Sequence, residues 1–295
     1  MNNSNNEKVF QKSNINWYPG HMAKTKRQIG EQLNLIDVVY EVIDSRMPRS
    51  SKINDIDDLI KNKKRILIMT KSDLCDTDKT NKFVKYYESL GYKVLQFDLQ
   101  GCKNLEPLIS LTESIMEDEF TKMAQKGLSR RPIRVLVVGV PNVGKSTLIN
   151  RLVGQNKAGV GSKAGFTKQL SWIRVNKNIE LLDSPGILWP KFEDQKEAHI
   201  LASLSSIKDE VVDSFDLSSF IIKTMYELYP KQLEERYGIT SISEDLIEEY
   251  DLIARRRGAL KKGGLTDYDK VSNIVIQDLQ NGRLGKVTFD DISNL

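Results

Sequence analysis

The chain has very few cysteines and histidines and no long apolar run. Cys75 and Cys102 are its only cysteines among 295 residues, and its two histidines are His21 and His199. This argues against a disulfide framework or a zinc site and favours a reducing cytoplasm. No apolar run approaches the ~18 residues that a membrane span needs, and the polar residues 1–6 do not resemble a secretory signal. We therefore expect a cytoplasmic protein with no membrane partner.

Charge is balanced overall but unevenly distributed. The chain carries 44 Lys and Arg against 40 Asp and Glu, and its hydrophobic content of 39% is ordinary for a globular protein. Residues 1–205 have a net charge of +9, whereas residues 206–295 have −5. A positive excess attracts phosphate backbones without specifying a sequence. Ordinary solvated surface charge is the alternative interpretation.

Short apolar runs alternate with amphipathic stretches through the first two thirds of the chain. The runs predict strands over residues 37–43, 65–69, 93–97, 133–138, 169–175 and 179–182. The stretches predict helices over residues 21–35, 54–61, 78–90, 105–123 and 145–153. This alternation indicates an α/β fold with a mostly parallel sheet and helices on both faces. The short link 176–178 predicts one antiparallel hairpin.

Helical periodicity replaces the strand pattern from about Ile207 onward. Helices are expected over residues 217–228, from Pro230, over 244–257 and over 268–279, with a break at Gly263-Gly264. The predicted organisation is therefore a flexible N-terminal extension (1–14), a nucleotide-binding domain (15–206) and a small all-α domain (207–295).

A phosphate-binding loop of the form GxxxxGK[ST] spans Gly139 to Ser146. It follows a predicted strand and opens a predicted helix, which is the context that such a loop requires. Lys145 is expected to bridge the β- and γ-phosphates, and the Ser146 hydroxyl to bind Mg²⁺. The residues expected to contact the nucleotide here are Pro141, Asn142, Val143, Gly144, Lys145, Ser146 and Thr147.

Two further segments resemble the switch elements of GTPases. Asp183-Ser184-Pro185-Gly186 matches DxxG at the end of a predicted strand, so Asp183 is expected to hold Mg²⁺ through water and Gly186 to donate its N–H to the γ-phosphate. Thr167 lies between this motif and the phosphate loop. Its hydroxyl is expected to complete the Mg²⁺ shell when triphosphate is bound.

Thr70-Lys71-Ser72-Asp73 matches the guanine-reading motif [NT]KxD. The Asp73 carboxylate can accept both N1–H and the exocyclic amine of guanine, which adenine cannot satisfy, and Lys71 can lay its methylenes across the base. In an ordinary GTPase this motif follows the phosphate loop, but here it precedes it. The order indicates a circularly permuted P-loop GTPase domain. A companion segment that backs the guanine is expected near residues 98–101, where it is poorly formed.

With these residues in hand, the chain resembles the ribosome biogenesis GTPase A family, the YlqF-type permuted GTPases. The resemblance rests on three long runs, residues 17–24, 139–152 and 182–192, and on Gly263-Gly264-Leu265 with Tyr268-Asp269-Lys270. It implies a GTPase that converts GTP to GDP and phosphate, acts late in assembly of the large (50S) ribosomal subunit, and is stimulated by that subunit. The implied partners are precursor ribosomal RNA and proteins, and the protein is expected to be monomeric off the ribosome.

Catalysis requires a group other than the residue after DxxG, because Ile187 cannot orient the attacking water. By its place in the family motif, His21 is the candidate catalytic group. Asn142 resembles the asparagine of potassium-activated GTPases, which suggests K⁺ beside Mg²⁺ as a second cofactor.

Other interpretations stay open from the sequence. The chain could be a P-loop kinase or ATPase in which residues 70–73 match by chance, or a scaffold that binds GTP without hydrolysing it. The basic residues 255–257 and 261–262 could contact RNA phosphates or simply favour a helix C-terminus. Trp17, Trp172 and Trp189 could stack on bases, but burial in the core is the expectation.

Overall fold

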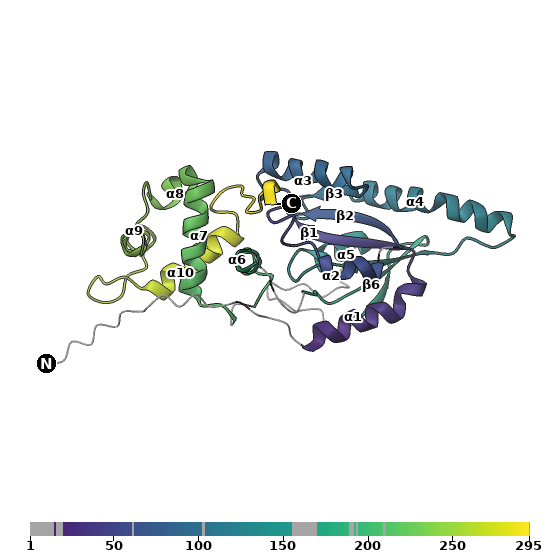
Figure 1. Cartoon of the computed structure of the whole chain (residues 1–295), viewed down its shortest axis with the longest axis horizontal. Coiled ribbons are helices and arrows are strands. Elements are labelled where there is room, and N and C mark those ends of the chain that lie inside the picture. The colour runs from purple at the N-terminus through teal and green to yellow at the C-terminus, as the bar shows by residue number, and fades with distance from the viewer. Residues whose placement is uncertain are drawn as a thin grey trace.

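A six-stranded sheet forms the core of the first part of the protein, which is described here from a computed structural model (Figure 1). The structure describes residues 15, 20–60, 62–101, 104–154, 170–188, 192, 194–208 and 211–294. The sheet order is β3-β2-β1-β4-β6-β5, and only β5 runs antiparallel to its neighbour. Its strands are β1 (Val38–Asp44), β2 (Lys64–Thr70), β3 (Lys93–Phe97), β4 (Ile133–Val138), β5 (Ser171–Arg174) and β6 (Ile179–Asp183). The predicted mostly parallel sheet with one antiparallel hairpin is confirmed.

Helices flank the sheet on both faces. They are α1 (Gly20–Gln32), α2 (Asn54–Ile60), α3 (Thr77–Ser89), α4 (Glu106–Gln125) and α5 (Lys145–Val153). Side chains alternate along the strands, so Leu67 and Met69 of β2 pack with Phe83 of α3, while Ile66 and Ile68 join the main core on the other face. Figure 1 shows α3 and α1 on opposite sides of the sheet.

The C-terminal part is helical, as predicted. It contains α7 (Ser214–Leu228), α8 (Pro230–Tyr237), α9 (Ile247–Arg257) and α10 (Tyr268–Gln280). Aspartates begin two of these helices, because Asp213 and Asp267 accept hydrogen bonds from backbone N–H groups in the first turn. Helix α7 packs against α10 and α6 (Gln195–Ser203). The sequence analysis did not predict α6.

The two parts of the chain are joined at several points. Helix α6 precedes residue 207 yet packs on α7, and the chain after α10 returns to the sheet domain. There Phe289 N donates to Arg46 O (2.8 Å), and the buried Asp290 carboxylate accepts from Arg49 N (2.7 Å) and Ser50 N (2.9 Å). The division at residue 207 therefore stays a prediction.

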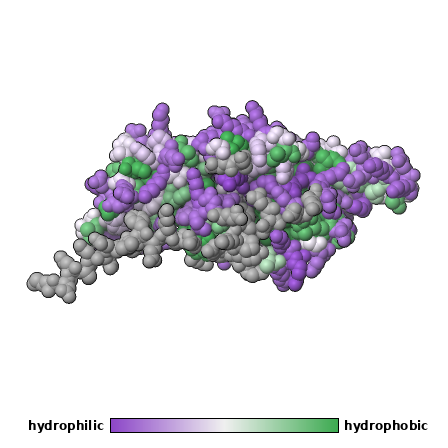
Figure 2. Space-filling view, in the orientation of Figure 1, coloured by the Kyte–Doolittle hydropathy of each residue, from purple (hydrophilic) through white to green (hydrophobic). Residues whose placement is uncertain are grey.

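The described surface carries both hydrophilic and exposed hydrophobic residues. On the face in Figure 2, hydrophilic residues cover much of the described surface, including the projecting end of α4. Among the described residues, no helix combines the length and the apolar character needed to cross a membrane. Trp172, expected in the core, is 42% exposed on β5. That expectation was wrong because β5 is an edge strand, which has a neighbouring strand, β6, on one side only.

Candidate nucleotide-binding site

The loop between β4 and α5 has the tight backbone that phosphate binding requires. Gly144 and Asn142 adopt left-handed conformations, with φ of 102° and 59°. A Cβ atom on Gly139 would lie 2.4 Å from the carbonyl oxygen of Val42, so this position has no room for a side chain. The loop thus lies close against β1 at the carboxyl ends of the parallel strands. It leads into the N-terminus of α5, where backbone N–H groups favour anions.

Lys145 is buried beneath this loop. Its ammonium donates to Gly139 O (3.0 Å) and Val140 O (2.9 Å), which holds the loop closed around the side chain. Burial lowers the pKa of Lys145 to about 8, and the negative charge of Asp183 opposes this shift. The cation therefore lies where a phosphate could replace its carbonyl partners.

Asp183 ends strand β6 with its side chain buried. Its Oδ1 finds no hydrogen-bond partner among the described residues. Burial raises the pKa of Asp183 to about 6, and the Lys145 cation opposes this shift. A buried carboxylate oxygen without a partner fits a hydrated Mg²⁺ ion, which binds hard oxygen ligands and keeps several waters. At this site such an ion would neutralise phosphate charge.

Replacing Asp183 by asparagine is expected to stabilise the nucleotide-free protein. The folded pKa near 6 lies above the unfolded value, so the carboxylate destabilises the fold increasingly as pH rises from ~4 to 6. Asp183→Asn should therefore raise the free energy of unfolding by on the order of 2 kcal/mol at pH 7.5, with little gain near pH 4. Urea unfolding at both pH values measures this. A variant less stable than wild type at pH 7.5 would contradict it.

The DxxG segment is packed directly against the phosphate loop. A Cβ atom on Gly186 would lie 2.7 Å from both Cα and N of Pro141, and Ile187 N donates to Gly139 O (3.3 Å). Ile187 itself is only 3% exposed. Its buried aliphatic side chain cannot orient a water, as the sequence indicated.

The segment Thr70–Asp73 meets the same loop although it lies about seventy residues earlier in the chain. Thr70 is fully buried, and its hydroxyl donates to Ile43 O (3.1 Å) and to Val143 O. The Lys71 ammonium donates to Asn142 O (2.8 Å). The Thr70 side chain thus fastens this segment to the phosphate loop.

Asp73 lies half-buried beyond Lys71, near the loop of residues 98–101. Burial raises the pKa of Asp73, and the negative charge of Asp98 adds to this effect. Asp98 itself accepts from Gln100 N (2.8 Å) and Gly101 N (2.9 Å), while Arg151 of α5 donates to Gln100 O (2.8 Å). The loop expected to back the guanine is therefore held against the helix that follows the phosphate loop.

Several predicted residues cannot be placed. Thr167, Trp17 and Trp189 lie outside the described residues, and for His21 the structure describes the backbone in α1 but not the side chain. Sequence reasoning also missed Asp44 and Arg46, which lie beside Lys71. One signal was available, because Asp44 ends a strand at the same sheet edge as the other site segments.

A phosphate loop, a DxxG segment and a preceding guanine motif around one sheet edge define a circularly permuted GTPase. A family model described as "50S ribosome-binding GTPase" matches residues 134–250. Ribosome biogenesis GTPase A of Priestia megaterium is 42% identical over 95% of this chain and 97% of its own length. The protein of the same name from Thermotoga maritima is 31% identical over 94% of both.

Solved structures agree with these relatives. YlqF in its GDP-bound form aligns with a TM-score of 0.64 and 26% identity, covering 90% of this chain and all of the other. GNP-bound YlqF from T. maritima aligns with a TM-score of 0.61 and 27% identity, covering 91% and 98%. The chain therefore belongs to the ribosome biogenesis GTPase A family. It is an enzyme that hydrolyses GTP and acts in ribosome biogenesis, so the kinase and scaffold alternatives are set aside.

Proposed function

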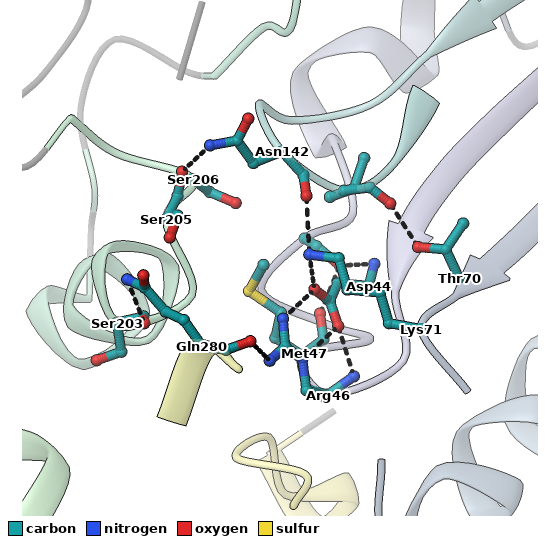
Figure 3. A network of polar contacts seen from close by, with 12 residues as sticks. Asp44, Arg46, Met47, Thr70, Lys71, Asn142, Ser203, Ser205, Ser206 and Gln280 are labelled. Atoms are coloured by element: carbon teal, nitrogen blue, oxygen red, sulfur yellow. Dashed lines mark hydrogen bonds and ion pairs between the residues drawn. The ribbon is translucent and has the colours of Figure 1, made fainter. Parts of the chain in front are cut away.

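We propose that this GTPase acts in late maturation of the large (50S) ribosomal subunit, as a cytoplasmic monomer that binds precursor ribosomal RNA and proteins in its GTP-bound state. One observation carries the proposal: the phosphate loop is hydrogen-bonded to the segment that leads into the helical part. Asn142 Nδ2 donates to Ser205 O (2.8 Å; Figure 3), and Ser206 Oγ donates to Pro141 O (2.8 Å). A change at the γ-phosphate can therefore reach the helical domain through two bonds.

Stimulation of hydrolysis by the large subunit is part of the same proposal. Because Ile187 cannot orient water, intrinsic turnover is expected to be slow, and His21 is the group proposed to act once the subunit is bound. Thr167, Ser146 and Asp183 are proposed to surround Mg²⁺, and Asn142 to hold K⁺. Turnover measured with and without large subunits, in wild type and His21→Ala, tests this. Equal stimulation of both proteins would remove His21 from the mechanism.

RNA contact is proposed for the basic cluster formed by Arg255, Arg256, Arg257, Lys261 and Lys262. Its residues are exposed at the end of α9 and on the following turn. One of these five cations, Lys261, forms an ion pair with Asp267 (Nζ to Oδ1, 3.6 Å). The cluster as a whole keeps a net positive charge. An exposed group of cations of this kind suits phosphate contacts, which are sensitive to salt.

GTP-dependent binding to large subunits is the direct test of the proposed function. The protein is expected to cosediment with immature large subunits at least ~10-fold more tightly with a non-hydrolysable GTP analogue than with GDP, since a coupling free energy of 1–3 kcal/mol is typical. Small subunits serve as the matched control. Equal affinity in the two nucleotide states would refute the proposal.

A further inference from the structure

Asp44 is a fully buried carboxylate that none of the predicted motifs contains. It ends strand β1 and accepts from three donors of Arg46: the backbone N (3.0 Å), Nε (3.1 Å) and Nη2 (2.9 Å). Arg46 is itself 2% exposed. Burial alone would favour the neutral acid, but the Arg46 and Lys71 cations outweigh it and hold the pKa of Asp44 well below its usual range. Asp44 is therefore a buried carboxylate paired with two cations.

The second cation on this carboxylate is the lysine of the guanine motif. Lys71 Nζ lies 2.8 Å from Asp44 Oδ2 and also 2.8 Å from Asn142 O (Figure 3). The sheet register creates this contact, because Asp44 pairs with Thr70 across β1 and β2. Lys71 also has a left-handed backbone, with φ of 57°. Both the backbone and the ammonium of Lys71 are thus held by groups of the protein itself.

Arg46 fixes the orientation of the carboxylate and connects it to the helical domain. Arg46 Nε and Nη2 donate to Asp44 Oδ1 and Oδ2, respectively. Asp44 Oδ2 also contacts Lys71 Nζ. The remaining Arg46 Nη1 donates to Gln280 O at the end of α10 (3.4 Å), and the Arg46 carbonyl accepts from Phe289 N (2.8 Å). The anchor for Lys71 is therefore held by both domains.

We propose that Asp44 is a positioning residue for guanine nucleotide, which acts by holding the Lys71 ammonium so that the lysine stem lies ready to cover the base. The inference rests on the proposed guanine-reading role of residues 70–73. Pre-organising the side chain lowers the entropy lost when the nucleotide binds. Without the anchor, Lys71 would keep one carbonyl partner and would sample other rotamers.

The test is a double-mutant cycle on the affinity for a fluorescent GDP. Asp44→Asn is expected to weaken binding by about 10- to 100-fold, the equivalent of one charge-assisted hydrogen bond. Lys71→Met, which keeps the stem but removes the ammonium, is expected to weaken it similarly. If Asp44 acts through Lys71, the double variant should bind no more weakly than Lys71→Met alone. Fully additive losses, or wild-type affinity in Asp44→Asn, would overturn the proposal.

Glu41→Gln provides the matched control. Glu41 is a fully buried carboxylate on the same strand and also pairs with two cations, Lys52 (3.8 Å) and Arg65 (3.2 Å), but it has no contact with the guanine motif. Its replacement should leave GDP affinity within about twofold of wild type, because its ion pairs involve no residue of the guanine motif. A loss of GDP affinity equal to that of Asp44→Asn would show that any buried charge on β1 has this effect, and would overturn the proposal.

Two further variants keep the test decisive. If Asp44→Asn fails to fold because Arg46 is left unpaired, Asp44→Asn with Arg46→Met removes the buried ion pair as a unit, and the cycle with Lys71→Met is run in that background. Asp73→Ala tests the underlying assignment separately. If Asp73→Ala keeps full GDP affinity, the guanine-reading assignment itself fails; if it loses affinity while the cycle is additive, only the role of Asp44 fails.

Discussion

Replacing Lys145 by alanine is expected to lower kcat/KM for GTP by roughly 10²- to 10³-fold, because a preorganised donor to the developing phosphate charge is lost. The loss should not come from unfolding. Lys145 is a buried cation whose pKa burial has already lowered to about 8, so its removal relieves a desolvation penalty. Phosphate release from GTP measures the activity, and thermal melting measures the fold.

Lys122→Ala is the control for this prediction, since that lysine is exposed in the last turn of α4 and lies outside the phosphate loop. It should retain wild-type turnover. If Lys145→Ala kept more than a tenth of the wild-type activity, the phosphate loop would not be the catalytic centre.

Asp73→Asn is expected to exchange the base preference from guanine to xanthine. The carboxylate accepts the exocyclic amine of guanine, whereas an asparagine amide can donate to the carbonyl that xanthine carries in its place. A site built around hydrogen bonds rejects a ligand that leaves them unpaired by as much as ~10⁴-fold. GTP affinity should therefore fall by at least ~100-fold, and XTP affinity should rise.

Competition of GTP, XTP and ATP against a fluorescent nucleotide measures this exchange. Asp78→Asn, an exposed aspartate in the first turn of the next helix, is the control and should leave the order of affinities unchanged. Should Asp73→Asn bind GTP as well as wild type does, residues 70–73 would not read the base.

Much of the fold could be predicted from the sequence, because the spacing of hydrophobic residues and the turn-forming residues between elements indicate the same helices and strands. The bounds of β3, β4 and α5 are as predicted, since each is a clear apolar or amphipathic run next to a turn. Helix α6 was missed because its buried residues, which include Ala198, Ile200, Leu201 and Ala202, do not form a single stripe in the sequence. Tertiary packing stabilises such a helix more than its own periodicity does.

The site was predictable to the extent that its motifs are local. The phosphate loop and DxxG segment could be assigned because backbone geometry and strand context are properties of neighbouring residues. The anchor at Asp44 was not predictable, because its contact with Lys71 depends on the register between β1 and β2. The contacts of Thr70 show the same limit, because its buried hydroxyl bonds the carbonyls of Ile43 and Val143, which are distant in sequence.

The most direct test of the permuted arrangement is an experimental structure with GDP and Mg²⁺ bound. A single nucleotide should have its β-phosphate within hydrogen-bond distance of the Lys145 ammonium and its guanine N1 and exocyclic amine within that distance of the Asp73 carboxylate. A nucleotide whose phosphates lie at Lys145 while its base lies away from Asp73 would contradict the arrangement.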